Sequence, residues 1–372
     1  MAGPPRCLIE AFEQTFRKSP DLFRAPGRVN LIGEHTDYNL GLVLPMAIDL
    51  ACYAASAPNR DGILRVHSVN LGQSRQWPVT DLMELTPQGD WADYVLGIAR
   101  ELRLERGYDL MLESTVPLGS GLSSSAALEV STALALGWKG ELPSLDLALL
   151  CQRADHQFLG IPSGIMDQYV SIFGKEGAAI KLDCLRLKSE LAPLPPGVAL
   201  VAVNSGVSHA LAQSAYKTRV QECAAAAAAM GVKNLRDANL GKLSLITDER
   251  LRRRARHVLT ENLRVLTFVA AAKRGDLAEL GRLMADSHRS LRDDYEVSCP
   301  EIDFLVDAAI KINGVWGSRI TGGGFGGCTI NLLDPAGVEN FQQTLFRQYR
   351  EKCGLEPRFY KVTPACGASQ IS

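Results

Sequence analysis

The sequence lacks the features by which proteins cross membranes or bind nucleic acids. No apolar run reaches the roughly 20 residues needed to cross a bilayer, and no initial apolar stretch is long enough for a secretory signal. Neither sign of charge is in excess, since 40 Lys and Arg residues face 41 Asp and Glu residues, a formal net charge of −1. A general nucleic-acid binder would show a strong basic excess. We therefore expect a soluble, cytoplasmic protein with no nucleic-acid and no membrane partner.

Two common metal and nucleotide patterns are also absent. The nine cysteines are scattered with no CxxC pair, which argues for reduced thiols and against disulfides or a zinc site. No GxxxxGK[ST] occurs, so the chain has no P-loop. A lone GxGxxG runs from Gly322 to Gly327, but strand-like residues follow it where a dinucleotide fingerprint opens a helix. We reject a dehydrogenase and expect this loop to pack either against a ligand or against the first domain.

What is present indicates two domains that mix helices and strands. With 372 residues, 46% of them hydrophobic and 22% charged, the chain is globular and too long for one ordinary core. The proline-rich stretch Leu191–Gly197 is the best linker candidate, so we place the domains at 1–195 and 196–372. Apolar periodicity predicts strands at Val29–Ile32 and Asp109–Val116, and helices at Ala126–Trp138, Leu145–Leu159 and Ile165–Phe173.

The second part of the chain is expected to be richer in helix. The alanine run Ala224–Ala229, ended by Gly231, is typical of a helix. Ser298 to Glu301 has the form of a capping box and predicts a helix start. We interpret the arginine-rich segment Leu251–His257 as the solvated face of a helix. The histidines that lack metal-site spacing are interpreted as solvated or capping residues, namely His67, His156, His209, His257 and His288.

The segment from Ala25 to Asn39, APGRVNLIGEHTDYN, concentrates ionisable groups beside an apolar strand. Gly33 breaks the strand, and Glu-His-Thr-Asp follows at once. Each carboxylate can accept hydrogen bonds from two neighbouring hydroxyl groups, so this composition suits a ligand rich in hydroxyls. The alternative is an ordinary charged surface turn.

A glycine- and serine-rich loop, Pro117–Ala127, lies between a predicted strand and a predicted helix. Gly119 and Gly121 allow the backbone to approach a ligand closely. The serines at 123–125 would stand at the helix N-terminus, where free N–H groups favour an anion and hydroxyls can reach a phosphate or magnesium. We favour phosphate binding over the alternative, in which one serine simply caps the helix.

Two aspartates are candidates for the chemistry. Asp167 falls in the first turn of a predicted helix, opposite its apolar face, where a carboxylate could serve as a general base or orient a hydroxyl. The alternative is an ordinary helix-start aspartate. Asp155, twelve residues earlier, could supply a metal ligand, but in isolation we interpret it as a surface helix residue.

Taken together, these segments resemble the three motifs of the GHMP small-molecule kinases. They are GRVNLIGEHTDYN from Gly27, PLGSGLSSSAA from Pro117 and TGGGFGGC from Thr321. The first, with GIMDQ at Gly164 and SHRSLRDDYEVS at Ser287, is similar to the galactokinase family in particular. The resemblance implies a two-domain α+β fold. Its N-terminal domain would be ribosomal-protein-S5-like and its C-terminal domain ferredoxin-like, with the active site in the cleft between them.

The resemblance further implies transfer of the ATP γ-phosphoryl group to the anomeric hydroxyl of α-D-galactose. Asp167 would face that hydroxyl, as a base or an orienter, and Arg28 would steady Asp167 and the transferring group. The implied sugar-binding residues are Glu34, His35, Thr36, Asp37, Gly164 and Tyr216. The implied ATP-binding residues are Gly119, Ser120, Gly121, Leu122, Ser123, Ser124 and Ser125.

A magnesium ion is the cofactor that the resemblance implies. Ser125 would ligate Mg²⁺, and Asp155 stands where the family usually has a glutamate, so that its shorter side chain could act through a water. The implied partners are galactose and ATP, and we expect a monomer. Two other readings stay open: a 1-kinase for N-acetylgalactosamine or another hexose, and a galactose sensor without turnover.

Overall fold

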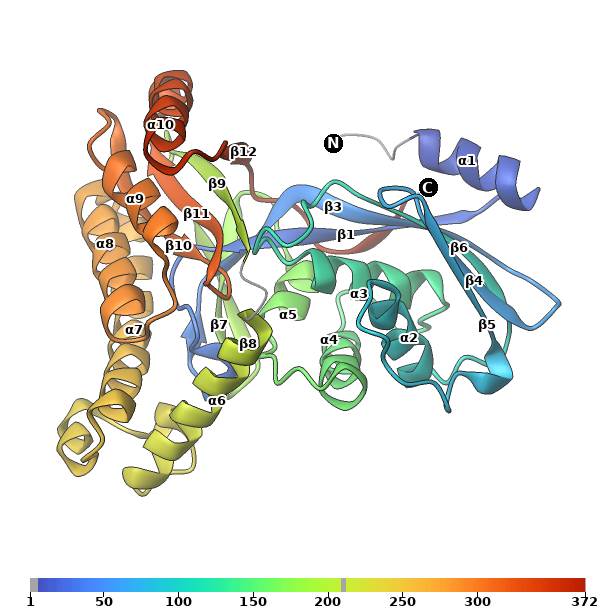
Figure 1. Ribbon diagram of the computed structural model, residues 1–372, viewed down its shortest axis with the longest axis horizontal. Coiled ribbons are helices and arrows are strands. Elements are labelled where there is room, and N and C mark those ends of the chain that lie inside the picture. The colour runs from blue at the N-terminus through green and yellow to red at the C-terminus, as the bar shows by residue number, and fades with distance from the viewer. Residues whose placement is uncertain (1–5, 209–211, 372) are drawn as a thin grey trace.

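The computed structural model describes residues 6–208 and 212–371, and it contains two main sheets with helices packed on both (Figure 1). His209 lies outside the described residues. Within them, no helix is long and apolar enough to span a membrane. The helices are α1 (Arg6–Phe16), α2 (Ala92–Glu101), α3 (Ser124–Ala135), α4 (Leu145–Arg153), α5 (Met166–Phe173), α6 (Ala212–Ala229), α7 (Glu249–Arg274), α8 (Leu277–Asp293), α9 (Pro300–Ala309) and α10 (Val338–Cys353).

A six-stranded sheet in the order β13-β1-β3-β6-β4-β5 forms the first body. Its pairs are antiparallel except for β4 with β6. The strands are β1 (Asp21–Asn30), β3 (Pro45–Pro58), β4 (Ile63–Ser68), β5 (Gln73–Pro78), β6 (Tyr108–Ser114) and β13 (Ser369–Ile371). Helix α1 covers one face, while α2 to α5 lie on the other (Figure 1). Because β13 pairs with β1, the end of the chain returns to the sheet in which the chain begins.

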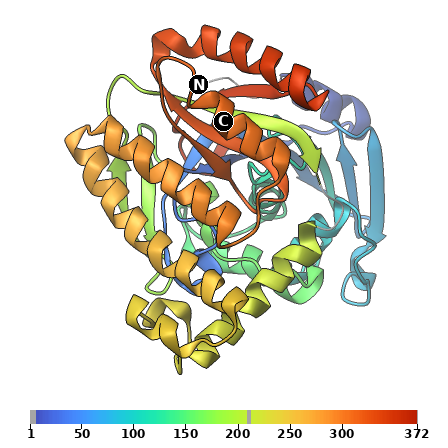
Figure 2. The ribbon, with the colours of Figure 1, turned by 60° about the vertical axis from the view of Figure 1, so that its left-hand side comes forward.

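The second body is built on an antiparallel sheet in the order β10-β11-β9-β12. Its strands are β9 (Ala199–Ser208), β10 (Val315–Thr321), β11 (Gly326–Leu333) and β12 (Arg358–Val362). Side chains alternate along β9: Val201 and Val203 join the cluster formed with α9 and α10, whereas Leu200 and Ala202 join the core shared with the first body. The two bodies are therefore packed through one continuous core. Figure 2 shows the long helices α7 and α8 lying side by side at the edge of this body.

A small antiparallel sheet, β2-β7-β8, lies beside α7. Its strands are β2 (Leu42–Val43), β7 (Ala178–Asp183) and β8 (Lys188–Pro193). The proline-rich stretch therefore continues β8 as far as Pro193 before the chain turns into β9. Strand β2 follows directly on the EHTD segment, so this sheet holds one end of that segment in place.

Several local predictions hold, and others need correction. Helices α3 and α5 and the alanine-rich end of α6 form as expected. The helix predicted over Leu145–Leu159 stops at Arg153 and continues as a π-helical segment, η3 (Ala154–Leu159). The helix predicted to start at Ser298 to Glu301 forms as α9, but the capping box is wrong, because Cys299 is the residue before α9 and the Ser298 hydroxyl donates instead to Asp303.

The arginine-rich segment of α7 is not a solvated face throughout. Arg254 is only 1% exposed, and its guanidinium pairs with the carboxylates of Glu222 and Glu296. His257 and His288 are also buried, at 0% and 3% exposed. For Arg254 the prediction failed because carboxylates from α6 and from the segment after α8 pair with the guanidinium, and that allows a charged side chain to be buried. His257 instead lies within hydrogen-bond distance of the Ser290 hydroxyl and the Glu34 carbonyl, and His288 lies 3.2 Å from the Asp303 carboxylate.

Candidate active site

An ion pair between Arg28 and Asp167 stands at the centre of the candidate site. Arg28 lies near the end of β1, just after an irregularity in its pairing with β3, and Asp167 lies in the first turn of α5. Arg28 Nε is 2.8 Å from Asp167 Oδ1, and Nη2 is 2.7 Å from Oδ2. Burial alone would lower the pKa of Arg28, but the charge and hydrogen bonds of Asp167, together with the charges of Glu34 and Asp37, outweigh it, so that the pKa is raised. The guanidinium is thus fully charged and fixed in orientation.

The glycine–serine loop closes around the same pair. Arg28 Nη1 donates to the Gly121 carbonyl at 2.6 Å. Ser123 precedes α3 in a left-handed conformation, with φ of 59°, and its hydroxyl donates to Asp167 Oδ2. Ser120 and Leu122 are the buried members of this loop, and the Ser120 hydroxyl donates to the Pro117 carbonyl. Of the residues predicted to bind ATP, these two line neither of the cavities that meet at the Arg28–Asp167 pair. Ser123, predicted among the phosphate-binding residues, thus also contacts Asp167, a contact that no sequence pattern predicts.

Two cavities meet at this pair. One, of about 270 Å³, is lined by most of the residues predicted to hold the sugar. The other, of about 460 Å³, is lined by the loop at 119–125, by Trp91 and Tyr94, and by the glycine loop at 323–327. Arg28, Asp167 and Ser125 belong to both walls. A ligand in one cavity would therefore meet a ligand in the other beside the Arg28–Asp167 pair.

The EHTD segment supplies the wall of the smaller cavity and is not a surface turn. Glu34, His35 and Asp37 all line it and are less than 10% exposed. Glu34 Oε1 accepts from the Gly322 N–H at 2.8 Å and lies 3.2 Å from Arg319 Nη2. Burial raises the pKa of Glu34 against the opposing pull of these and other positive groups. The glycine loop was predicted to pack either against a ligand or against the first domain. Through this hydrogen bond to Glu34 it packs against the first body.

Asp37 and His35 carry shifted pKa values because both are buried. Burial, together with the nearby Asp167 carboxylate, raises the pKa of Asp37 to about 7. Burial lowers the pKa of His35 to about 3, so this imidazole is neutral at ordinary pH. His35 Nδ1 lies 2.9 Å from the Tyr38 hydroxyl, and its ring centroid is 5.7 Å from that of Tyr216.

Of the predicted sugar residues, Thr36 does not line the cavity. Its hydroxyl lies 2.8 Å from the Gly33 carbonyl and 2.7 Å from the Leu42 carbonyl, so it closes the loop on itself. Gly164 does line the cavity, and a Cβ there would lie only 1.8 Å from Asp37 Oδ2. Any larger residue at 164 would displace the Asp37 carboxylate. Tyr216 also lines the cavity.

Asp155 is buried in the π-helical segment η3, which corrects its interpretation as a surface residue. Its Oδ2 accepts from the Ser163 hydroxyl at 2.7 Å and from Gln168 Nε2 at 2.9 Å. The same Gln168 nitrogen is 3.1 Å from Glu129 Oε2. Burial raises the pKa of both carboxyl groups. Neither Glu129 nor Gln168 was predicted as a site residue, although Gln168 ends the GIMDQ motif and Glu129 follows the serine-rich motif by two residues.

Helix α7 supports the EHTD segment from behind. Glu261 Oε1 accepts from the Gly33 N–H at 2.9 Å, and His257 Nε2 is 3.1 Å from the Glu34 carbonyl. Burial would raise the pKa of Glu261, but the charges around it, led by Arg264, hold that pKa at about 2. These two contacts could not be predicted, because the sequence pattern around Glu261 and His257 is typical of a solvated helix.

Known protein families match three parts of this chain, and curated relatives match nearly its whole length. The galactokinase galactose-binding signature matches residues 10–58, the GHMP kinase N-terminal domain matches 93–175, and the GHMP kinase C-terminal domain matches 268–351. Galactokinase of Homo sapiens is 44% identical over 97% of this chain and 95% of its own length. Galactokinase of Roseiflexus sp. (strain RS-1) is 43% identical over 98% and 96%.

Solved structures agree as well. A Lactococcus lactis galactokinase complexed with galactose superposes with a TM-score of 0.93 at 34% identity, covering 98% of this chain and 99% of that one. Methanococcus jannaschii mevalonate kinase, at 19% identity and a TM-score of 0.65, shares the fold. The expected α+β fold of two GHMP domains is thereby confirmed. The chain belongs to the galactokinase family of the GHMP kinases.

Proposed function

We propose that the protein transfers the γ-phosphoryl group of ATP to the anomeric hydroxyl of α-D-galactose, giving α-D-galactose 1-phosphate and ADP. The observation that carries the proposal is the meeting of a polar, carboxylate-lined cavity with a loop-lined cavity at Arg28 and Asp167. The galactokinases at 43–44% identity over nearly the full chain support the choice of sugar.

In this proposal the smaller cavity holds galactose. Glu34 and Asp37 accept hydrogen bonds from sugar hydroxyls, and the neutral His35 and Tyr216 complete the wall. Gly164 leaves the space that the Asp37 carboxylate needs. Asp167 accepts the hydrogen bond of the anomeric hydroxyl and directs its oxygen toward the second cavity.

The larger cavity holds the phosphates of ATP. The loop at 119–125 leads into the N-terminus of α3, where free N–H groups and the helix dipole favour an anion. Arg28 stands between the two ligands, and its fixed positive charge stabilises the charge on the transferring group. Phosphoryl transfer requires mainly such positioning and charge neutralisation.

We also propose a magnesium ion at the wall that Ser125 and Asp155 share. A hydroxyl and a carboxylate oxygen are ligands that Mg²⁺ prefers, and both line the smaller cavity. A cation there would also compensate the burial of Asp155 and Glu129 together, which fits this donor set. When bound, the ion neutralises charge on the nucleotide phosphates.

A coupled assay of ADP release with galactose, N-acetylgalactosamine and glucose tests the proposal. We expect turnover with galactose and Mg-ATP, and we expect Asp167→Ala to lose turnover while it still binds galactose by calorimetry. Absence of turnover with galactose would overturn the proposal. Turnover with N-acetylgalactosamine alone would favour the other hexose kinase, and galactose binding without turnover would favour the sensor.

A further inference from the structure

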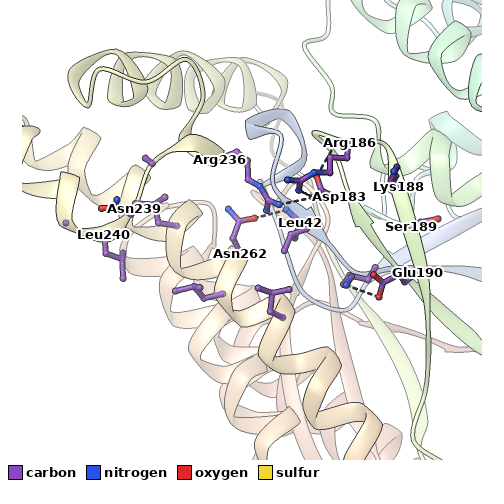
Figure 3. A pocket seen from close by; sticks show the side chains of 16 residues that line it. Leu42, Asp183, Arg186, Lys188, Ser189, Glu190, Arg236, Asn239, Leu240 and Asn262 are labelled. Carbon is purple, nitrogen blue, oxygen red and sulfur yellow. Dashed lines mark hydrogen bonds and ion pairs between the residues drawn. The ribbon is translucent and has the colours of Figure 1, made fainter.

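A third cavity, of about 860 Å³, lies outside the active site (Figure 3). It is enclosed by β7 and β8, by α7, and by two short 3₁₀ segments, η4 (Leu235–Asp237) and η5 (Leu240–Leu245). None of its lining residues lines either active-site cavity. Its volume falls within the roughly 300–1,000 Å³ typical of small-molecule sites.

The cavity has an apolar floor on α7, and two of its three leucines are about half exposed. Leu259, Leu263 and Leu266 lie at positions i, i+4 and i+7 of α7 and therefore share one face of that helix. Leu263 and Leu266 are 53% and 47% exposed, and Leu240 from η5 is 44% exposed. Three large apolar side chains this exposed around one cavity indicate a surface that an apolar ligand could bury.

The rim of the cavity carries an excess of positive charge. Asp183 Oδ2 accepts from both Arg186 and Arg236, each at 2.8 Å, so one carboxylate serves two guanidinium groups. Figure 3 shows both arginines directed at Asp183. Lys181 pairs with Glu190 at 3.0 Å, whereas Lys188 has no ion pair among the described residues. Four cations and two carboxylates leave two positive charges uncompensated.

The cavity wall is hydrogen-bonded to the sugar-binding segment. Asn262 Oδ1 accepts from the Leu42 N–H at 2.7 Å, and both residues line the cavity. The neighbouring Glu261 accepts from the Gly33 N–H, at the start of the EHTD segment. A ligand that moves α7 against β2 would therefore act on both ends of the segment that carries Glu34 and Asp37.

We propose that this cavity binds an amphipathic anion, with an apolar body against the leucines and an acidic head group near Arg236 and Lys188, and that its occupancy alters galactose binding. The charge excess selects this occupant over a second copy of the chain, because a symmetric dimer would bring two positive rims together. The effect on galactose rests on the proposed function, whereas binding to the cavity does not.

The first test uses 8-anilinonaphthalene-1-sulfonate, an aromatic sulfonate whose fluorescence rises on binding, with saturating ATP present to occupy the nucleotide cavity. Leu263→Asp and Lys188→Glu should each weaken its binding by about five-fold or more. The matched controls Leu71→Asp and Lys352→Glu, exposed residues outside the cavity, should stay within about two-fold. The uncharged analogue N-phenyl-1-naphthylamine should bind more weakly than the sulfonate.

Equal affinity of the cavity variants and the controls would overturn the site, and equal affinity for the uncharged analogue would overturn its selectivity for anions. A dimer in sedimentation that Leu263→Asp dissociates would overturn the small-molecule occupant in favour of a second copy.

The second test measures galactose affinity by calorimetry with and without saturating sulfonate. We expect a change of at least about two-fold in the unmodified protein and a smaller change in Leu263→Asp at the same sulfonate concentration, because fewer of its cavities are occupied. An unchanged galactose affinity would overturn the coupling, while sulfonate binding without any galactose binding would refute the proposed function and leave the cavity site standing.

Discussion

Arg28→Lys is the sharpest test of the site, because it keeps the positive charge and removes only its geometry. The guanidinium donates to both oxygens of Asp167 and to the Gly121 carbonyl, with distances between 2.6 and 2.8 Å. A lysine ammonium is a point charge on a flexible stem and can replace one of these three hydrogen bonds at its original position. The variant therefore loses the planar link between α5 and the glycine–serine loop.

The size of the effect follows from the two hydrogen bonds that are lost. Hydrogen bonds to charged groups contribute about 1.5–3 kcal/mol each. We take the low end, because the Asp167 side chain is 27% exposed and water replaces part of the loss. Two bonds then amount to about 3 kcal/mol, which is roughly a 100-fold fall in kcat if they hold the reacting geometry. Galactose affinity should change by less than about three-fold, since Glu34 and Asp37 keep their positions.

Steady-state ADP release at saturating galactose and Mg-ATP gives kcat, and calorimetry gives the affinity for galactose. Arg24→Lys is the matched control, because Arg24 lies on the same strand, donates to the Cys366 carbonyl, and lines neither cavity. Thermal unfolding checks that both variants fold. A kcat of Arg28→Lys within about five-fold of the unmodified protein would contradict this reasoning. It would mean that the planar guanidinium and its three hydrogen bonds do not position the reacting groups.

Three further predictions concern pH, metal and stability. Burial raises the pKa of Asp37 to about 7, so its carboxylate is protonated as the pH falls from about 8 to about 6. Galactose binding, measured by calorimetry, should weaken over this range, because the protonated group can no longer accept two hydroxyl hydrogen bonds. Asp37→Asn should flatten this pH profile. Asp155→Asn should weaken Mn²⁺ binding, measured by electron paramagnetic resonance with a non-hydrolysable ATP analogue, by about ten-fold or more. Arg254→Met should lower the free energy of unfolding in urea by about 3 kcal/mol, because Glu222 stays buried without its main partner, while Met at the exposed Arg282 should change it little.

The sequence predicted the centre of the site well, for a physical reason. Arg28 and Asp167 are separated by 139 positions, and no periodicity connects them. Arg28 lies near the end of a strand and Asp167 near the start of a helix. The residues around them, GEHTD and GIMDQ, suit neither a hydrophobic core nor an ordinary turn. Each position therefore showed a local signal in the sequence, and the family resemblance joined the two; the structure shows that their side chains form an ion pair.

The supporting residues could not be predicted in this way. Glu261 and Asn262 accept from the Gly33 and Leu42 N–H groups, one on each side of the EHTD segment. They do so from the middle of a helix whose charged residues look solvated. Any residue with an acceptor oxygen at the right place would satisfy a backbone donor, so the contact leaves no signature in the sequence of either partner. The burial of Asp155 and Glu129 could not be predicted for a related reason. Carboxylates are expected at the surface, and only the structure shows that both lie beside the Gln168 amide.

The position of Glu34 shows how these supporting contacts bear on the chemistry. Its Oε1 is occupied by the Gly322 N–H and by Arg319, both of which come from the second body. In the proposed function the other carboxylate oxygen accepts from the sugar. The glycine loop and β10 therefore fix the orientation of this carboxylate toward the cavity. Arg319 is fully buried and also donates to the Asn30 carbonyl at the end of β1. The wall of the smaller cavity is therefore held jointly by both bodies. If this cavity holds galactose, as we propose, a change in how the two bodies pack should alter galactose binding.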